Sequence, residues 1–347
     1  MVFAALCIAG ATPAPTWAGL AEDLSPEKAP SVSLSELVTI AFENNPMLRA
    51  AKHKWEAAIE RYPQARALPN PMVMYEYSSD PMETAQRLSI SQEVPFPGKL
   101  KLQGDIASRE AQIARLEFER DVRDIIVSLK TSDFELLYID RAREITRQNK
   151  DVMDHLVKIG TTDYAQDVTT LNDVLKAQAQ LAQLSYDLVL LEELRQTEVT
   201  RINTLLNRDP ETPIGKLGDE PLPPIAFSIE ELYAVAREHQ QELKIADLEI
   251  EKSLKAMNLA DKVWLPDFTL GAGYFDMRDF MVGGVSESMD DAYGLSMGVS
   301  LPIWFNKNRA TQSEARLNYL SAREMRDLQL NNTYTNVKNA YFKLTNA

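Results

Sequence analysis

The amino-acid sequence predicts a mostly helical protein with a smaller β part, in which a unit of helix, strand, loop, strand and helix occurs twice. A Leu-Pro-Asn step begins at Leu68, and a Leu-Pro-Asp step begins at Leu265. Two extended runs follow each step. The second run ends at Pro95 in the first repeat and at Pro302 in the second, and a long charged segment with helical periodicity follows it. Because proline disfavours helical geometry in the residue before it, each step ends one helix and begins a strand.

The extended runs cover about residues 71–78 and 87–95 in the first repeat and about 267–275 and 292–302 in the second. In the last run, apolar residues alternate with small or polar ones. The apolar set is Tyr293, Leu295, Met297, Val299 and Leu301, and the small polar set is Ser296, Gly298 and Ser300. A period of two is typical of a strand with two different faces. An ordinary soluble sheet that is packed on one side would show the same alternation.

The length of these runs favours a membrane environment over a soluble sheet. Strands of about 8–10 residues cross a bilayer when they are tilted. The segments between the strand pairs are predicted to be long helices, which offer no second sheet for packing. We therefore expect the apolar set to face lipid and the small polar set to face a water-filled lumen.

Residues 104–206 are predicted to form one antiparallel helical hairpin. Residues 105–158 contain neither glycine nor proline, and their apolar residues recur at helical spacing. The returning helix carries a heptad seam, which is typical of coiled-coil-like packing. The seam consists of Val174, Ala177, Leu181, Leu184, Leu188 and Leu191. Residues 159–163 are predicted to form the turn, with Gly160 ending the first helix.

The other domain boundaries follow from composition. Residues 1–21 are predicted to be a signal peptide, because an apolar core precedes small residues. The first repeat covers 22–206, a proline-rich connector covers 207–227, and the second repeat covers 228–347. The only cysteine, Cys7, lies in the predicted signal peptide, and Leu6 stands where lipid attachment would need a small residue. The second repeat ends midway along its last helix, so we expect it to be truncated.

Composition and motifs argue against several classes of function. A net charge of -14 leaves no basic surface for nucleic acid. No apolar run beyond the N-terminus reaches the length of about 18 residues that a membrane helix needs. The histidines, His53, His155 and His239, are scattered, and the sequence contains no HExxH, CxxC or Gly-rich phosphate motif. We therefore expect no enzyme activity, no cofactor and no metal site. Met72 and Met74 are expected to contact lipid or a neighbour.

Four motifs, LPNP, EVPFPGK, LLNRDPETPIG and LPDF, resemble those of the TolC-like outer-membrane efflux proteins, in particular their heavy-metal efflux branch. The resemblance covers the chain from about residue 33 to its end. It implies a trimeric 12-stranded outer-membrane β-barrel, to which each of three copies gives four strands. It also implies that the long coiled-coil-like helices form a periplasmic barrel.

The resemblance further implies a function and a set of partners. The protein would be the outer-membrane channel of a tripartite efflux pump in a Gram-negative bacterium, a passive exit duct that exports heavy-metal cations. Its partners would be the other copies of the homotrimer, outer-membrane lipid, a periplasmic adaptor (membrane fusion protein) and an inner-membrane proton-driven exporter. The resemblance places the adaptor contact at the hairpin tip, at Val157, Gly160, Thr161 and Asp163.

Three alternatives stay open on the sequence alone. A multidrug channel of the same family, for organic toxicants, would carry the same motifs. A periplasmic adaptor would also contain a long hairpin, but its strand pairs would not be duplicated around that hairpin. A soluble coiled-coil scaffold would explain the heptad seam but not the alternation over residues 293–301.

Overall fold

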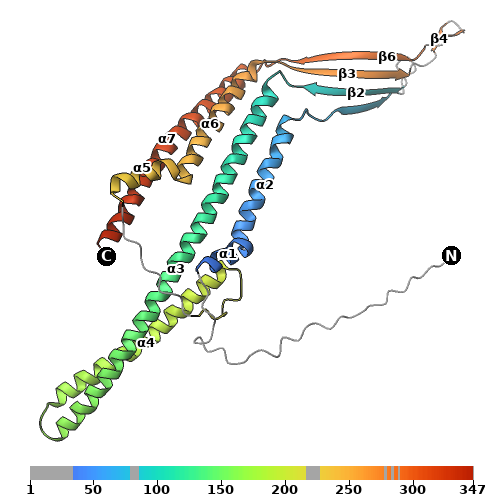
Figure 1. Ribbon diagram of the computed structural model, residues 1–347. Coiled ribbons are helices and arrows are strands. Elements are labelled where there is room, and N and C mark those ends of the chain that lie inside the picture. The colour runs from blue at the N-terminus through green and yellow to red at the C-terminus, as the bar shows by residue number, and fades with distance from the viewer. Residues whose placement is uncertain are drawn as a thin grey trace, which may run out of the picture. The chain divides into compact units, whose positions relative to one another are not determined.

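The computed structural model describes residues 34–78, 86–215, 227–276, 280–282, 285–287 and 290–346. The predicted fold class is confirmed, since the chain combines long helices with a four-stranded antiparallel sheet (Figure 1). The predicted signal peptide and residues 216–226 of the connector lie outside the described residues. The chain divides into two compact units, one of Met1–Asn45 and Ile125–Leu222, the other of Pro46–Asp124 and Pro223–Ala347.

The duplication is present in the helices. The first repeat begins with α1 (Leu34–Asn44, 11 residues) and α2 (Pro46–Arg66, 21 residues). The second begins with α5 (Ile229–His239) and α6 (Gln241–Asp261), which have the same two lengths. A single residue, Asn45 or Gln240, separates the two helices in each case. Different local signals give the same break, because Pro46 interrupts the first repeat whereas no proline interrupts the second.

The four-stranded sheet belongs to the second unit and draws two strands from each repeat. Its strands are β1 (Met72–Tyr77), β2 (Gln86–Val94), β3 (Asp267–Asp276) and β6 (Ala292–Ser300). The order is β1-β2-β3-β6, so β1 and β6 form the two edges. A further hairpin of β4 (Phe280–Val282) and β5 (Val285–Glu287) lies in the segment that was expected to be a loop.

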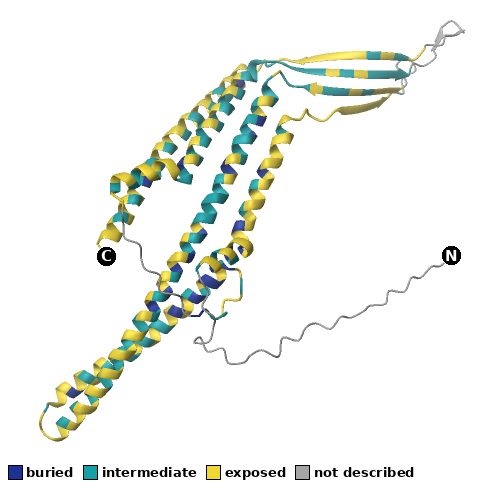
Figure 2. Cartoon of the chain, viewed as in Figure 1, coloured by how far each residue is buried: buried dark blue, intermediate teal, exposed yellow. Residues whose placement is uncertain are grey.

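The core of the first unit lies among α1, the later part of α3 (Lys99–Ala165) and α4 (Leu171–Leu205), where Figure 2 shows buried positions in dark blue. The largest fully buried apolar side chains of this unit are Leu37, Leu129, Leu136, Ile202, Leu206 and Ile214. Asn45 donates from its side-chain amide to the Leu205 carbonyl at 2.8 Å, which joins the end of α1 to the end of α4.

Polar side chains of α4 hold the start of the connector. The Asn203 side chain is fully buried and donates to the carbonyls of Pro210 and Thr212, both at 2.8 Å. Arg195 is also buried and bonds to the Asp140 carboxylate and the Ile214 carbonyl. Because buried backbone carbonyls need a donor, these contacts allow a proline-rich segment without regular structure to pack against the helices.

The predicted turn at residues 159–163 is wrong, because α3 continues unbroken from Lys99 to Ala165 over 67 residues. The hydroxyls of Thr161 and Thr162 bond to carbonyls of the preceding helical turn, so these residues fit inside the helix. A Cβ on Gly160 would stand 3.8 Å from Val174 Cγ2 of α4, which places this glycine on the contact between the two helices. Helix continuation and close packing outweigh the cost of an internal glycine, about 1 kcal/mol.

The heptad seam of α4 faces its partner helix. Its first member, Val174, is buried, and the later members are half-buried, whereas the residues between them are mostly exposed. The two antiparallel segments pack along this seam without burying the rest of their surface. Among the described residues, no helix combines the length and the apolar character needed to cross a membrane. The last helix, α7 (Phe305–Thr345), has 41 residues.

Candidate functional site

The two motifs that mark the repeat meet where the sheet joins the helices. The Asp267 carboxylate, at the start of β3, accepts a hydrogen bond from the Phe96 backbone N–H at 2.7 Å. It also accepts two bonds from the Lys99 ammonium, at 2.8 and 2.9 Å. The side chains of Lys99 and Asp267 are only 15% and 25% exposed. Charge-assisted bonds in this shielded position fix the start of α3 to the start of β3. We call Phe96, Lys99 and Asp267 the junction lock.

Apolar and backbone features reinforce the junction lock. The rings of Phe96 and Phe268 stack with their centroids 6.5 Å apart. Gly98 has a φ of +91°, in the left-handed region that favours glycine, and this lets the chain turn sharply from β2 into α3. A Cβ at this position would also stand 3.4 Å from the Lys262 side chain. The junction is therefore a stiff connection between the sheet and its helices.

Sequence reasoning identified both motifs of the junction lock but did not predict their contact. Lys99 and Asp267 are 168 residues apart, and nothing in their spacing joins them. One signal could have found the pair. A lysine just after β2 and an aspartate at the start of β3 are of opposite charge, and they meet if the neighbouring strands are antiparallel.

The sheet has two chemically different faces that extend over all four strands. On one face, Tyr293 of β6 lies opposite Tyr274, which lies opposite Leu88, which lies opposite Tyr75. The next row on the same face is Leu295, Ala272, Ile90 and Val73. The other face carries the row Ser296, Gly271, Ser91 and Met72. The register therefore places the apolar set and the small polar set of β6 on opposite faces.

The apolar face is uncovered in the chain. Tyr293 and Leu295 are 85% and 92% exposed, and Met297, Val299 and Leu301 are exposed as well. A contiguous apolar surface of this kind marks contact with lipid or with another protein. Which face meets lipid stays a prediction. Met72 and Met74 lie on the small polar face, which differs from the face of the apolar set.

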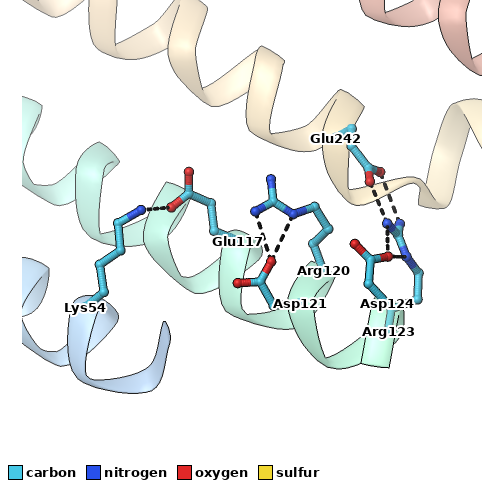
Figure 3. A network of polar contacts seen from close by, with 7 residues as sticks. All are labelled: Lys54, Glu117, Arg120, Asp121, Arg123, Asp124 and Glu242. Carbon is cyan, nitrogen blue, oxygen red and sulfur yellow. Dashed lines mark hydrogen bonds and ion pairs between the residues drawn. The ribbon is translucent and has the colours of Figure 1, made fainter. Parts of the chain in front are cut away.

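Ion pairs attach α2 and α6 to α3 within the second unit (Figure 3). Lys54 of α2 bonds to Glu117 of α3 at 2.6 Å. Arg123 of α3 donates to both carboxylate oxygens of Glu242, at the start of α6, and to Asp124. The Arg123 guanidinium lowers the pKa of the Glu242 carboxyl, and the Glu242 carboxylate in turn raises the pKa of Arg123. A bidentate pair fixes the orientation of both groups, so it aligns the two helices.

The predicted tip residues lie on the last turns of α3 rather than in a loop. Val157, Gly160 and Asp163 are half-buried and Thr161 is exposed. The connection between α3 and α4 is formed by residues 166–170, where Asp167 has a φ of +57°. Thr170 caps α4 by accepting a bond from the Asp173 N–H, and its hydroxyl lowers the pKa of the Asp173 carboxyl.

Sequence reasoning missed the exposed apolar residues around this connection. Their exposed fractions lie between 44% and 71%, and they are Tyr164, Val168, Leu171 and Leu175. We call these four residues the tip patch. Exposed apolar side chains that gather at one end of a hairpin are candidates for contact with a partner. The Asp-Val-Thr-Thr-Leu sequence from Asp167 to Leu171 could have revealed the true turn, because Thr170 is followed by an acidic residue in the first helical turn.

Two kinds of chemical site can be checked among the described residues, a metal site and a serine nucleophile. Among the described residues, no group of three or more His, Cys, Asp or Glu side chains is placed to hold a metal ion. Residues 294–298 match the Gly-x-Ser-x-Gly pattern of hydrolase nucleophiles. However, Ser296 lies inside β6, whereas that chemistry needs the serine on a sharp turn between a strand and a helix.

A sheet with two different faces and two open edges, attached to long helices in a duplicated unit, defines a class of outer-membrane channel proteins. The chain matches the outer membrane efflux protein family over residues 37–208 and 232–347. The protein therefore belongs to this family. It is an outer-membrane efflux channel protein with a large helical periplasmic part. The family consists of channels rather than enzymes, and membership sets aside the adaptor and scaffold alternatives.

Solved structures share the fold. The outer membrane protein VceC from Vibrio cholerae has a TM-score of 0.71 at 18% identity, over 86% of this chain and 75% of that chain. The outer-membrane channel OprN has a TM-score of 0.76 at 18% identity, over 90% and 75% of the two chains. CusC, a transmembrane channel, has a TM-score of 0.67 at 14% identity, over 91% and 75%. A search of curated proteins gave no match.

We predict that replacing Asp267 by Ala loosens the junction lock. The Phe96 N–H and the Lys99 ammonium would lose their shared acceptor, and an unsatisfied polar group in a shielded site costs about 1–3 kcal/mol. The free energy of unfolding, followed by tryptophan fluorescence during urea unfolding in detergent, should fall by about that amount. Asp267→Asn should lose less, because the amide oxygen still accepts from Phe96. Asp276→Ala, at the other end of β3, is the control. An equal loss in Asp267→Ala and Asp276→Ala would contradict the lock.

Proposed function

We propose that the protein is the passive exit duct of a tripartite efflux pump. In this proposal three copies form a homotrimer, and their twelve strands, four from each copy, close into one barrel in the outer membrane. The observation that carries the proposal is the sheet, which has one continuous apolar face, one face of small and polar residues, and open edges at β1 and β6. Barrel closure satisfies the edge hydrogen bonds and places the apolar face in lipid.

The small polar face suits the inner wall of the duct. Glycine and serine side chains occupy little space and are compatible with water, so a wall made of them leaves a wide hydrated passage. Gly271, Gly273, Ser89 and Ser91 continue this face from β6 across β3 and β2. A duct of this kind needs no reacting group. In the proposal, an inner-membrane proton-driven exporter supplies the energy.

Heavy-metal cations are the proposed cargo. The resemblance of the EVPFPGK and LPDF motifs to the heavy-metal branch supports this cargo. A net charge of -14 also favours the passage of cations over anions, although this electrostatic effect does not select one cation. Organic toxicants are the second candidate, because the fold is equally compatible with a multidrug duct.

The tip patch is the proposed contact for the periplasmic adaptor. The connection between α3 and α4 closes the hairpin at the end of α3 that is opposite to the junction lock. Its apolar side chains could pack against the helical hairpin of an adaptor. Val157, Gly160, Thr161 and Asp163 lie within two helical turns of this patch on α3. They are part of the same proposed contact, but Gly160 serves the packing of α3 on α4.

The cargo is tested by deleting the gene and restoring the full chain from a plasmid. We expect the deletion strain to become sensitive to heavy-metal salts such as those of copper, silver, zinc and cobalt, and the restored strain to recover. Growth should be compared across concentration series of metals, dyes and detergents. Unchanged tolerance of metals with new sensitivity to dyes or detergents would assign the duct to organic toxicants.

The tip patch is tested by Val168→Asp, since Val168 is 71% exposed and its replacement leaves the helix core intact. A charge in an apolar contact should abolish resistance while the level and heat stability of the outer-membrane protein stay unchanged. Val168→Ile, which keeps the apolar character, is the matched control. Full resistance in the Val168→Asp strain would remove the tip patch from the mechanism. Gly160→Trp is unsuitable for this purpose, because it would separate α3 from α4.

A further inference from the structure

The two repeats differ in the pairing of their second strand. In the first repeat, β2 and the start of α3 are joined to β3 through the junction lock. In the second repeat, β6 pairs with β3 alone among the described strands, and the segment after it is exposed. Ile303, Trp304 and Phe305 are 58%, 70% and 61% exposed. β2 therefore has a neighbouring strand on both sides, whereas the outer edge of β6 has none among the described strands.

The duplication identifies which residues correspond. When Pro95 is aligned with Pro302, Leu88 corresponds to Leu295, Ser89 to Ser296 and Lys99 to Asn306. When the Leu-Pro-Asp step is aligned with the Leu-Pro-Asn step, Asp267 corresponds to Asn70, and Leu270 therefore corresponds to Val73. Under both alignments, residues on the apolar face correspond to residues on the apolar face. β6 is thus the counterpart of β2, and the other free edge, β1, is the counterpart of β3.

We propose that β6 of one copy pairs with β1 of the neighbouring copy in the register that β2 and β3 use within the chain. Gln92 lies opposite Leu270, and Ile90 lies opposite Ala272. The corresponding contacts place Val299 opposite Val73, and Met297 opposite Tyr75, of the neighbouring copy. The proposal rests on the homotrimer of the proposed function, and it assigns the partner of each residue along the seam.

A second junction lock follows at the same seam. Asn70 takes the place of Asp267 and, in the trimer, accepts the backbone N–H of Ile303 from the neighbouring copy, as Asp267 accepts that of Phe96. In the single chain the Ile303 N–H donates to the Leu301 carbonyl at 2.9 Å, so the second lock exchanges this bond for the one to Asn70. Asn306 takes the place of Lys99, but its amide nitrogen stands two bonds nearer the backbone than the Lys99 ammonium. The second lock therefore keeps the bond from the backbone N–H and lacks the ion pair. Neutral hydrogen bonds are weaker than charge-assisted ones, so the second lock is weaker than the junction lock within the chain.

The side chains on the small polar face fit this register. Met74 of β1 would lie opposite Gly298 of β6, and Met72 would lie opposite Ser300. Met72 and Met74 are 62% and 45% exposed in the single chain. A long side chain opposite a glycine or serine fills the space that the small residue leaves. This accounts for methionines on a face where small and polar residues predominate.

Disulfide crosslinking tests the register in the full chain with Cys7→Ser, which removes the only native cysteine. One variant carries Tyr75→Cys with Met297→Cys, and a second carries Met74→Cys with Gly298→Cys. The two variants cover both types of antiparallel pair, of which one brings the Cβ atoms closer. β1 and β6 are separated by two strands in the chain, about 14 Å at the usual strand spacing, so a disulfide within one copy is excluded.

We expect at least one variant to give covalently linked dimers and trimers on boiled, non-reducing gels. Ile90→Cys with Ala272→Cys, the corresponding pair within the chain, should link without forming multimers. Val73→Cys with Leu295→Cys is displaced by four residues, about 13 Å, and should not link. Multimers in the displaced variant and not in the first two would overturn the register. A heat-sensitive trimer without any of these links would overturn the proposal while leaving the trimeric duct intact, whereas absence of the trimer would contradict the proposed function itself.

The second lock is tested by exchanging its amides for the charged pair. Asn70→Asp combined with Asn306→Lys should raise the temperature at which the SDS-resistant trimer dissociates by more than the sum of the two single changes. If the shift in dissociation temperature of the double variant equals the sum of the shifts of the two single variants, the two side chains do not meet.

Discussion

The backbone groups along β1 and β6 impose the constraint on which the rest of the structure depends. An edge strand in a membrane cannot leave its N–H and C=O groups without partners, because hydrocarbon offers none. A four-stranded sheet is far too narrow to close on itself, and in the proposed barrel its two edges pair with strands from other copies. The proposed closure also accounts for the different chemistry of the two faces, because it would put one face in lipid and the other in water.

The duplicated unit explains how one chain can satisfy this constraint. Each repeat supplies two strands, and the contact between the repeats at the junction lock is a pattern that neighbouring copies can reuse. The lock lies where the sheet ends and the helices begin, and it fixes the direction in which α3 leaves the sheet. Ion pairs such as those of Lys54 and Arg123 then hold α2 and α6 against α3. The junction lock therefore orients α3, and the ion pairs align α2 and α6 with it.

Much of the fold follows from local patterns in the sequence. The strands could be predicted because alternation over residues 293–301 and the Leu-Pro steps each determine structure over a few residues. The turn at residues 159–163 could not, because the penalty of Gly160 is small and its contact with Val174 belongs to the packed hairpin. The junction lock and the bonds of Asn203 join residues through the folded chain, and periodicity carries no information on such contacts.

The central claim is that the apolar face of the sheet meets lipid and the small polar face meets water. Single cysteines at positions 295, 296, 297 and 298 of the Cys7→Ser chain test it most directly, with water-soluble and lipid-soluble thiol reagents applied to intact outer membranes. Positions 296 and 298 should react with the water-soluble reagent, and positions 295 and 297 with the lipid-soluble one. The reverse pattern, or equal reaction at all four positions, would contradict the account.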